Sequence, residues 1–171
     1  SVELDKNIDL VGVAFNAAVV NKFNKNHDGI STDTALAVKD YFVHKPTNIE
    51  HKKQRIVGHI VSAGFSSYGD NELVYEEELK GTKNPFNIAL GSVVYKMVDK
   101  KFARLLHESV DQDSPLYNQV SASWEIGFND YQIAVGSENL SEAEIVTDKK
   151  QIEELSQYLK AAEGNGTMKD G

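Results

Sequence analysis

Three long runs of apolar and β-branched residues constrain the fold of this chain most. They cover residues 8–20, 55–66 and 86–99. Because β-branched side chains pack well on a pleated surface, and Gly12 allows a bend in the first run, we predict three long strands. Long connections separate these strands, which argues against alternating βαβ units. We therefore expect an α+β fold, a mostly antiparallel β-barrel or sandwich with about three flanking helices.

The predicted helices lie in the connections between the runs and at the end of the chain. Apolar residues at helical spacing predict helices over residues 31–44 and 101–110, and a third that begins at Asp148. Asp148 and Gln151 form a capping box at the start of this third helix. Shorter strands are expected at residues 73–79, 120–127 and 132–135. We assign residues 1–147 to a core, followed in the same domain by a C-terminal helix and flexible tail, residues 148–171.

Composition limits the classes of partner and cofactor. The 171 residues carry a formal net charge of −8 and no cysteine. An acidic chain disfavours a nonspecific grip on nucleic acid, and no apolar run reaches the length of a membrane span. The absence of cysteine excludes disulfides, thiolate catalysis and cysteine-based zinc sites. We expect no nucleic-acid partner, no membrane contact, no metal and no cofactor.

Residues 24–29 begin like a calcium-binding loop, with alternating oxygen-bearing side chains followed by glycine. The first ligand position is Asn24 rather than aspartate, and the twelfth is Ala35 rather than a bidentate glutamate. A strand, not a helix, is predicted to precede it. We therefore predict a turn made of Asn, Asp and Gly residues.

The predicted strand at residues 120–127 carries two hydroxyl groups, Ser121 and Ser123. Because successive side chains of a strand alternate between its faces, these two serines share one face, about 7 Å apart. On this pattern alone, polar residues on a sheet surface are the simpler interpretation. The alternative is catalysis, because a histidine that accepts the proton of a serine hydroxyl makes it a nucleophile, and His51 lies about seventy residues upstream.

Three stretches together resemble the prohead (procapsid) maturation serine proteases of tailed bacteriophages, which are related to the herpesvirus assembly proteases. The helical segment reaching residues 37–41 resembles the approach to the family's histidine. Residues 48–51, Asn-Ile-Glu-His, resemble the histidine motif, and residues 119–123, Gln-Val-Ser-Ala-Ser, resemble the nucleophile motif. The resemblance covers roughly residues 8–147.

The resemblance implies that His51 is the general base and Ser121 the nucleophile, with Ser123 as the competing nucleophile. The third member of the triad is not assigned. We expect Glu50 to face away from His51, His59 to lie about 25 Å along the chain from it, and Glu125 to lie about 13 Å from Ser121. The family's orienting acid comes from a strand after the nucleophile, and we expect that strand to be missing or removed here.

The resemblance further implies an endopeptidase inside the phage procapsid, in the host cytoplasm. Its substrates would be the scaffold or core protein, the major capsid protein and the protease itself, and self-association is left open. The alternative is a noncatalytic assembly protein, because phage tail-tube proteins resemble these proteases structurally. The distance between His51 and the two serines distinguishes the two interpretations, since only a protease needs His51 within hydrogen-bond reach of a serine.

Overall fold

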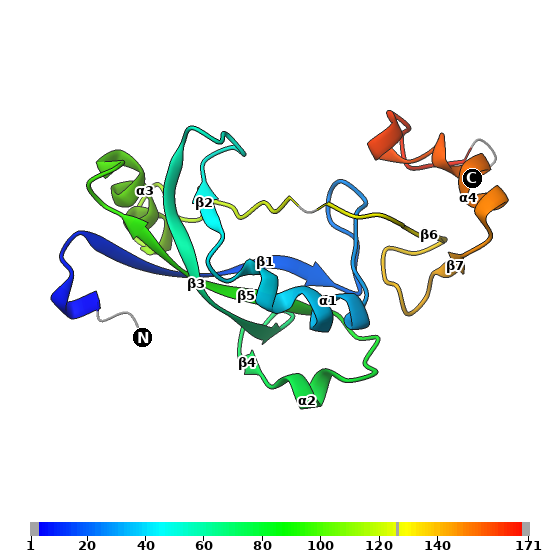
Figure 1. Cartoon of the computed structure of the whole chain (residues 1–171), viewed down its shortest axis with the longest axis horizontal. Coiled ribbons are helices and arrows are strands. Elements are labelled where there is room, and N and C mark those ends of the chain that lie inside the picture. The colour runs from blue at the N-terminus through cyan, green and yellow to red at the C-terminus, as the bar shows by residue number, and fades with distance from the viewer. Residues whose placement is uncertain (1–3, 126, 169–171) are drawn as a thin grey trace.

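The structure, a computed structural model, describes residues 4–125 and 127–168 and is an α+β fold with mostly antiparallel sheets. The main sheet has the strand order β1-β5-β3-β2, and the short β4 pairs with β3 (Figure 1). Two further strands, β6 and β7, form a separate antiparallel pair. The strands are β1 (Leu10–Val20), β2 (Pro46–Asn48), β3 (Ile56–Ser67), β4 (Leu73–Val74), β5 (Phe86–Tyr95), β6 (Ile133–Val135) and β7 (Glu144–Val146).

Four α-helices and three short 3₁₀ turns accompany the strands in the described residues. The α-helices are α1 (Thr32–Val38), α2 (Glu76–Leu79), α3 (Lys100–Val110) and α4 (Lys149–Ser156), and the 3₁₀ turns are η1 (Leu4–Lys6), η2 (Lys39–Phe42) and η3 (Lys160–Ala162). Side-chain caps begin α1 and α4, and the cap of α4 is the predicted Asp148. Ser31 Oγ accepts the Thr34 N–H at the start of α1, and Asp148 Oδ1 accepts the Gln151 N–H at the start of α4.

The main sheet is open, so the prediction of a closed barrel is wrong. In the described residues β1 pairs along its length with β5 alone, and β2 with β3 alone, which leaves both as edge strands. The α+β class and the antiparallel pairing are confirmed. A sandwich stays a prediction.

The core lies where α1, α2 and the middle of the sheet meet. Val20, Ile88, Phe65 and Phe86 are almost completely buried, and the rings of Phe65 and Phe86 meet edge to face with centroids 5.5 Å apart. Such pairs of aromatic rings add to the stabilisation that burial supplies. The core therefore fixes the central strands. The candidate site residues His51, Ser121 and Ser123 lie outside it.

Residues 24–29 form the predicted turn. Asn24 Oδ1 accepts hydrogen bonds from the backbone N–H groups of Asn26 and Asp28, at 2.8 and 3.0 Å.

None of the helices in the described part of the chain has the length and apolar character that crossing a membrane requires.

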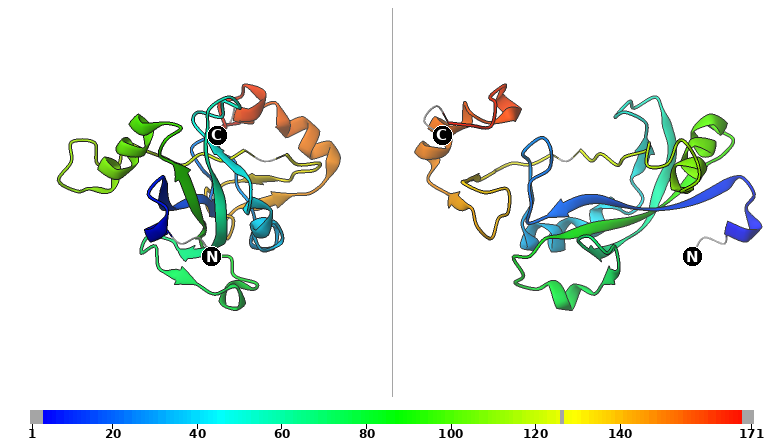
Figure 2. Two further views of the ribbon diagram at one scale, coloured as in Figure 1. Left: turned by 60° about the vertical axis from the view of Figure 1, so that its left-hand side comes forward. Right: turned by 180° about the vertical axis from the view of Figure 1, so that it is seen from behind.

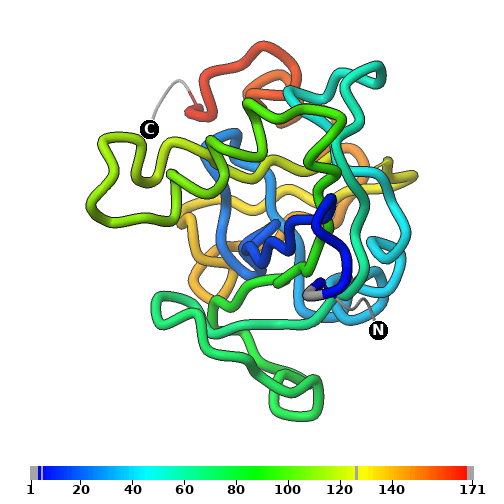
Figure 3. Tube along the Cα trace, turned by 90° about the vertical axis from the view of Figure 1, so that its left-hand side faces the viewer, coloured from blue at the N-terminus to red at the C-terminus, as the bar shows by residue number. Residues whose placement is uncertain are grey.

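The C-terminal elements lie at the far end of the long axis from η1, as Figures 1 and 2 both show. An extended segment after α3 leads to β6, β7 and α4. Viewed from the η1 end in Figure 3, the loop that carries α2 projects from the side of the molecule.

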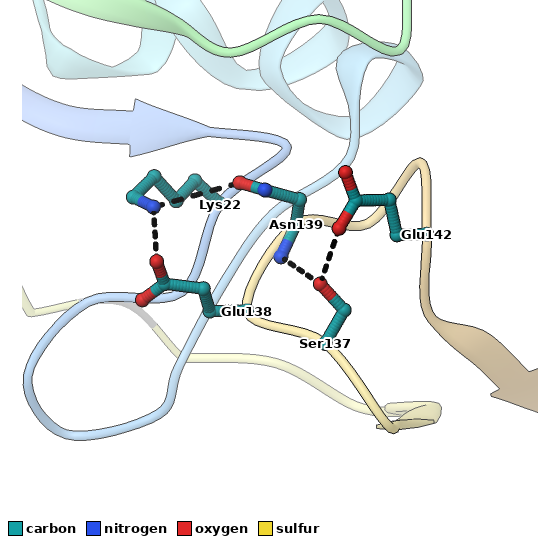
Figure 4. A network of polar contacts seen from close by, with 5 residues as sticks. All are labelled: Lys22, Ser137, Glu138, Asn139 and Glu142. Atoms are coloured by element: carbon teal, nitrogen blue, oxygen red, sulfur yellow. Dashed lines mark hydrogen bonds and ion pairs between the residues drawn. The ribbon is translucent and has the colours of Figure 1, made fainter.

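Residues 137–142 attach these elements to the end of β1 (Figure 4). Lys22 Nζ donates to Glu138 Oε1 at 2.6 Å, and the Leu140 N–H donates to the Asn21 carbonyl at 2.9 Å. The hydroxyl of Ser137 donates to Glu142 Oε2 at 3.0 Å. This polar network joins the C-terminal elements to the residues that follow β1.

Candidate active site

His51 lies in a tight turn between β2 and β3. The Lys52 N–H donates to the Ile49 carbonyl at 3.1 Å, and the two residues between them, Glu50 and His51, both have φ 55°. Positive φ at both central residues is the requirement of a type I′ hairpin turn, which normally selects Asn or Gly. A non-glycine residue in this region costs roughly 1–3 kcal/mol. The backbone of this turn is therefore strained at His51. Strain of this kind is often found at functional sites.

The side chain of Glu50 points to basic residues of the same turn. Glu50 Oε2 accepts from Lys52 Nζ at 2.8 Å and lies 4.0 Å from Arg55 Nη1. The hydrogen bond from Lys52 lowers the pKa of Glu50, with a further contribution from the Arg55 charge. Glu50 is thus engaged with these cations.

The segment that carries the serines begins on α3. The backbone N–H of Val120 donates to the hydroxyl of the buried Ser109 at 3.1 Å. From there the chain is extended, with Val120 and Trp124 half-buried and Ser121 and Ser123 exposed. Ala122 is exposed as well, so the expected alternation of inner and outer side chains holds at Val120 and Trp124 but not at Ala122.

The prediction of a strand at 120–127 is wrong for the residues that the structure describes, since residues 120–125 and 127 belong to no strand. Residue 126 of that range lies outside the described residues. Within the described ranges no backbone–backbone hydrogen bond involves residues 120–130. The segment is therefore extended without a neighbouring strand.

Ser123 meets His51. The Ser123 Oγ lies 2.9 Å from His51 Nε2, within hydrogen-bond distance. Ser121 lines the same cleft, and no hydrogen bond joins it to His51 in the described part of the chain. The structure thus brings one of the two predicted serines to the predicted histidine, although 72 residues separate them in sequence.

Glu125 lies at the other nitrogen of the same ring. Its Oε2 is 3.7 Å from His51 Nδ1, which is an ion-pair distance but too long for a hydrogen bond. The two side chains are 81% and 42% exposed, so solvent screens their interaction. When Nε2 accepts a proton from serine, Nδ1 carries the ring proton, and the Glu125 carboxylate stands where it favours this tautomer.

The sequence did not lead us to Glu125, because we considered its distance from Ser121, about 13 Å, and not its distance from Ser123. The signal was present: Glu125 follows Ser123 by two residues, so an extended chain places both side chains on one side, about 7 Å apart. A histidine ring can be contacted by two side chains at that spacing, one at each nitrogen.

A cleft of about 650 Å³ is lined by His51, Ser121 and Ser123, while Glu125 lies outside its lining. Its walls come from the His51 turn, the start of α3 and the serine segment. The apolar side chains that line it are Ile49, Phe102, Leu105 and Val120, and two cations, Arg55 and Lys101, also reach it. Arg55 Nη2 is 3.7 Å from Asp99 Oδ2, so one of these cations is partly neutralised. The cleft has a hydroxyl–imidazole pair, Ser123 and His51, at its wall.

His59, the other histidine considered near the motif, lies on β3, and its Nδ1 is 2.7 Å from the hydroxyl of Tyr95 on β5. It is not among the residues that line the cleft. Within the described residues no group of three or more His, Cys, Asp or Glu side chains is arranged to hold a metal ion.

Comparison of the chain with protein-family models, with curated proteins and with solved structures found no match. The functional assignment therefore rests on the geometry of His51, Ser123 and Glu125 and on the motifs that carry them.

Proposed function

We propose that this protein is a serine endopeptidase of the prohead maturation type. The observation that carries the proposal is the contact of His51 Nε2 with Ser123 Oγ at 2.9 Å, with Glu125 at the opposite ring nitrogen. A polar surface without a catalytic role does not require a hydroxyl, a base and a carboxylate in this order, with the hydroxyl and the base lining a cleft.

The chemistry is acyl transfer to serine. Ser123 Oγ attacks the peptide carbonyl, while His51 Nε2 accepts the hydroxyl proton and returns it to the leaving amine. Water then attacks the acyl-enzyme, again with His51 as base. Glu125 orients the ring and stabilises the imidazolium form. Of the two serines in the motif, the hydrogen bond favours Ser123 as nucleophile over Ser121.

The resemblance of residues 48–51 and 119–123 to the histidine and nucleophile motifs supports the family assignment. From it we propose the phage scaffold or core protein and the major capsid protein as substrates, and the procapsid interior, in the host cytoplasm, as the location. We also propose that the architecture is a herpesvirus-protease-like sandwich.

A fluorophosphonate probe tests the mechanism without knowledge of the cleavage site. Such a probe phosphonylates a serine that a neighbouring base activates, and mass spectrometry of the labelled peptide identifies the residue. We expect the label on Ser123, loss of labelling in Ser123→Ala and His51→Ala, and retained labelling in Ser121→Ala. A label on Ser121 would reassign the nucleophile, and no labelling of folded protein at either serine would contradict the peptidase.

The second candidate function is a noncatalytic assembly protein. Residues 121–125 and 127–130 favour it, because these described residues make no backbone–backbone hydrogen bond and can pair with a strand of a neighbouring subunit. The same labelling experiment separates the two functions, since an assembly protein has no activated serine.

A further inference from the structure

A second cavity, of about 430 Å³, lies against a different face of α3 from the candidate active site. Its two apolar residues are Val11 of β1 and Ala103 of α3. Lys100, Arg104 and His107 also line it and share one helix face, since residues three and four apart lie one above the other. Lys96, which precedes the helix, is a fourth basic residue in the same cavity.

This cavity concentrates positive charge in an acidic protein. The chain carries a net charge of −8, yet Glu108 is the one acidic residue that lines the cavity. Lys96 and Lys100 make no side-chain hydrogen bond or ion pair with any residue in the described ranges. Four basic side chains held together, with Arg104 alone of them paired to a carboxylate in the described residues, favour an anion between them.

Glu108 orients the guanidinium of Arg104. Its Oε1 accepts from Arg104 Nε at 2.6 Å, one helical turn away. An arginine has five N–H donors, so the four on its two terminal nitrogens stay available. A planar fork of this kind recognises phosphate oxygens, and the lysines add compact point charges.

We propose that this cavity binds a small ligand that carries a diphosphate or triphosphate group. The helical rise from Lys100 to His107 is about 10 Å, which suits a short row of linked phosphates rather than one. Nucleic acid fits less well, because the basic side chains are confined to one cavity and the net charge of the whole chain repels a phosphate backbone. The proposal is independent of the peptidase chemistry.

Tripolyphosphate is the probe that tests the site, by titration calorimetry on the whole chain. We expect saturable binding with a dissociation constant below about 1 mM. The double variant Lys100→Gln/Arg104→Gln should weaken binding about tenfold, since it removes two of the cations that face the ligand. Both side chains are exposed, so the fold should be kept, as circular dichroism would verify.

Lys149→Gln/Lys150→Gln is the matched control, because it removes the same charge from the start of α4, away from the cavity. It should change the affinity by less than about twofold. Equal weakening in both double variants would overturn the proposal, since binding would then follow overall charge. Absence of saturable binding would also overturn it, and so would tighter binding of a ten-nucleotide single strand than of tripolyphosphate.

Discussion

At the scale of single residues, His51 is held between two side chains of one extended segment. Ser123 contacts Nε2 as a hydrogen-bond partner, whereas Glu125 reaches Nδ1 only at ion-pair distance and is 81% exposed. Exposed ion pairs contribute about 0.2–1 kcal/mol to the free energy. We therefore expect the Glu125 contact to matter less than the Ser123 contact. In the peptidase that we propose, the serine is required for the reaction, and the carboxylate changes its rate.

Glu125→Gln should therefore lower kcat about two- to fivefold, the rate equivalent of an exposed ion pair. Ser123→Ala should lower it about a thousandfold or more, as loss of a nucleophile does. Initial rates of cleavage of a scaffold-protein fragment measure both. Glu153→Gln on α4 removes the same charge at a distance and serves as the control. A thousandfold loss in Glu125→Gln would instead mean that the carboxylate hydrogen-bonds to the ring in the substrate complex.

At the scale of secondary-structure elements, the hairpin that positions His51 depends on a close approach at Gly58. A Cβ atom on this residue of β3 would overlap the Val93 carbonyl oxygen of β5 and would contact Thr47 Oγ1 of β2. Three strands thus meet at a position with no room for a side chain. The register of β2 against β3, and with it the position of the His51 turn, depends on this glycine.

Gly58→Ala should destabilise the protein by about 1–3 kcal/mol, the usual cost of forcing a group into packed structure. Urea unfolding, monitored by circular dichroism, measures the change. Gly64 lies on the same strand, and a Cβ there would meet no atom within 4 Å. Gly64→Ala should therefore be neutral or stabilising by up to about 1 kcal/mol, because alanine loses less backbone entropy on folding. Equal destabilisation by both substitutions would contradict the close approach.

The long strands could be predicted from sequence because their signal is local. The runs at 8–20, 55–66 and 86–99 became Leu10–Val20, Ile56–Ser67 and Phe86–Tyr95. The sequence of residues 120–127 alternates polar and apolar residues, but alternation indicates an extended chain and cannot say whether a partner strand is present. Residues 73–79 were expected to form one strand; instead the Tyr75 N–H donates to Glu78 Oε1 and a short helix, α2, follows β4.

The site was also predictable in part, because its two motifs are local signals in the sequence. The motifs identified His51 and a choice of two serines, but the choice depends on where the β2–β3 turn ends in space. That turn has positive φ at Glu50 and His51, neither of which is a residue type that signals a type I′ turn. Tertiary contacts decide such a backbone, so the position of the imidazole could not be read from the sequence, whereas the two-residue spacing of Ser123 and Glu125 could.

At the scale of the whole molecule, the C-terminal elements are attached to the main sheet through the network of residues 137–142. The hydrogen bond from Lys22 lowers the pKa of Glu138, and the same contact raises the pKa of Lys22. A carboxylate with a lowered pKa in the folded state stabilises the fold above its ordinary pKa of about 4.3. That contribution is lost as the pH falls through the lower, folded-state value.

Acidification should therefore loosen this attachment before it unfolds the sheet. The Leu140 N–H, which donates to the Asn21 carbonyl beside Lys22, reports on the attachment by hydrogen exchange. Its protection factor should fall as the pH drops below about 4.3, while amides of β3 keep theirs. Glu138→Gln should lower the protection factor about two- to fivefold at neutral pH, the equivalent of an exposed ion pair, with little further change in acid. Glu144→Gln on β7 should behave as the parent protein. If Leu140 and the β3 amides lost protection together at every pH, the two ends of the molecule would unfold as one unit, and the Lys22–Glu138 pair would not control their attachment.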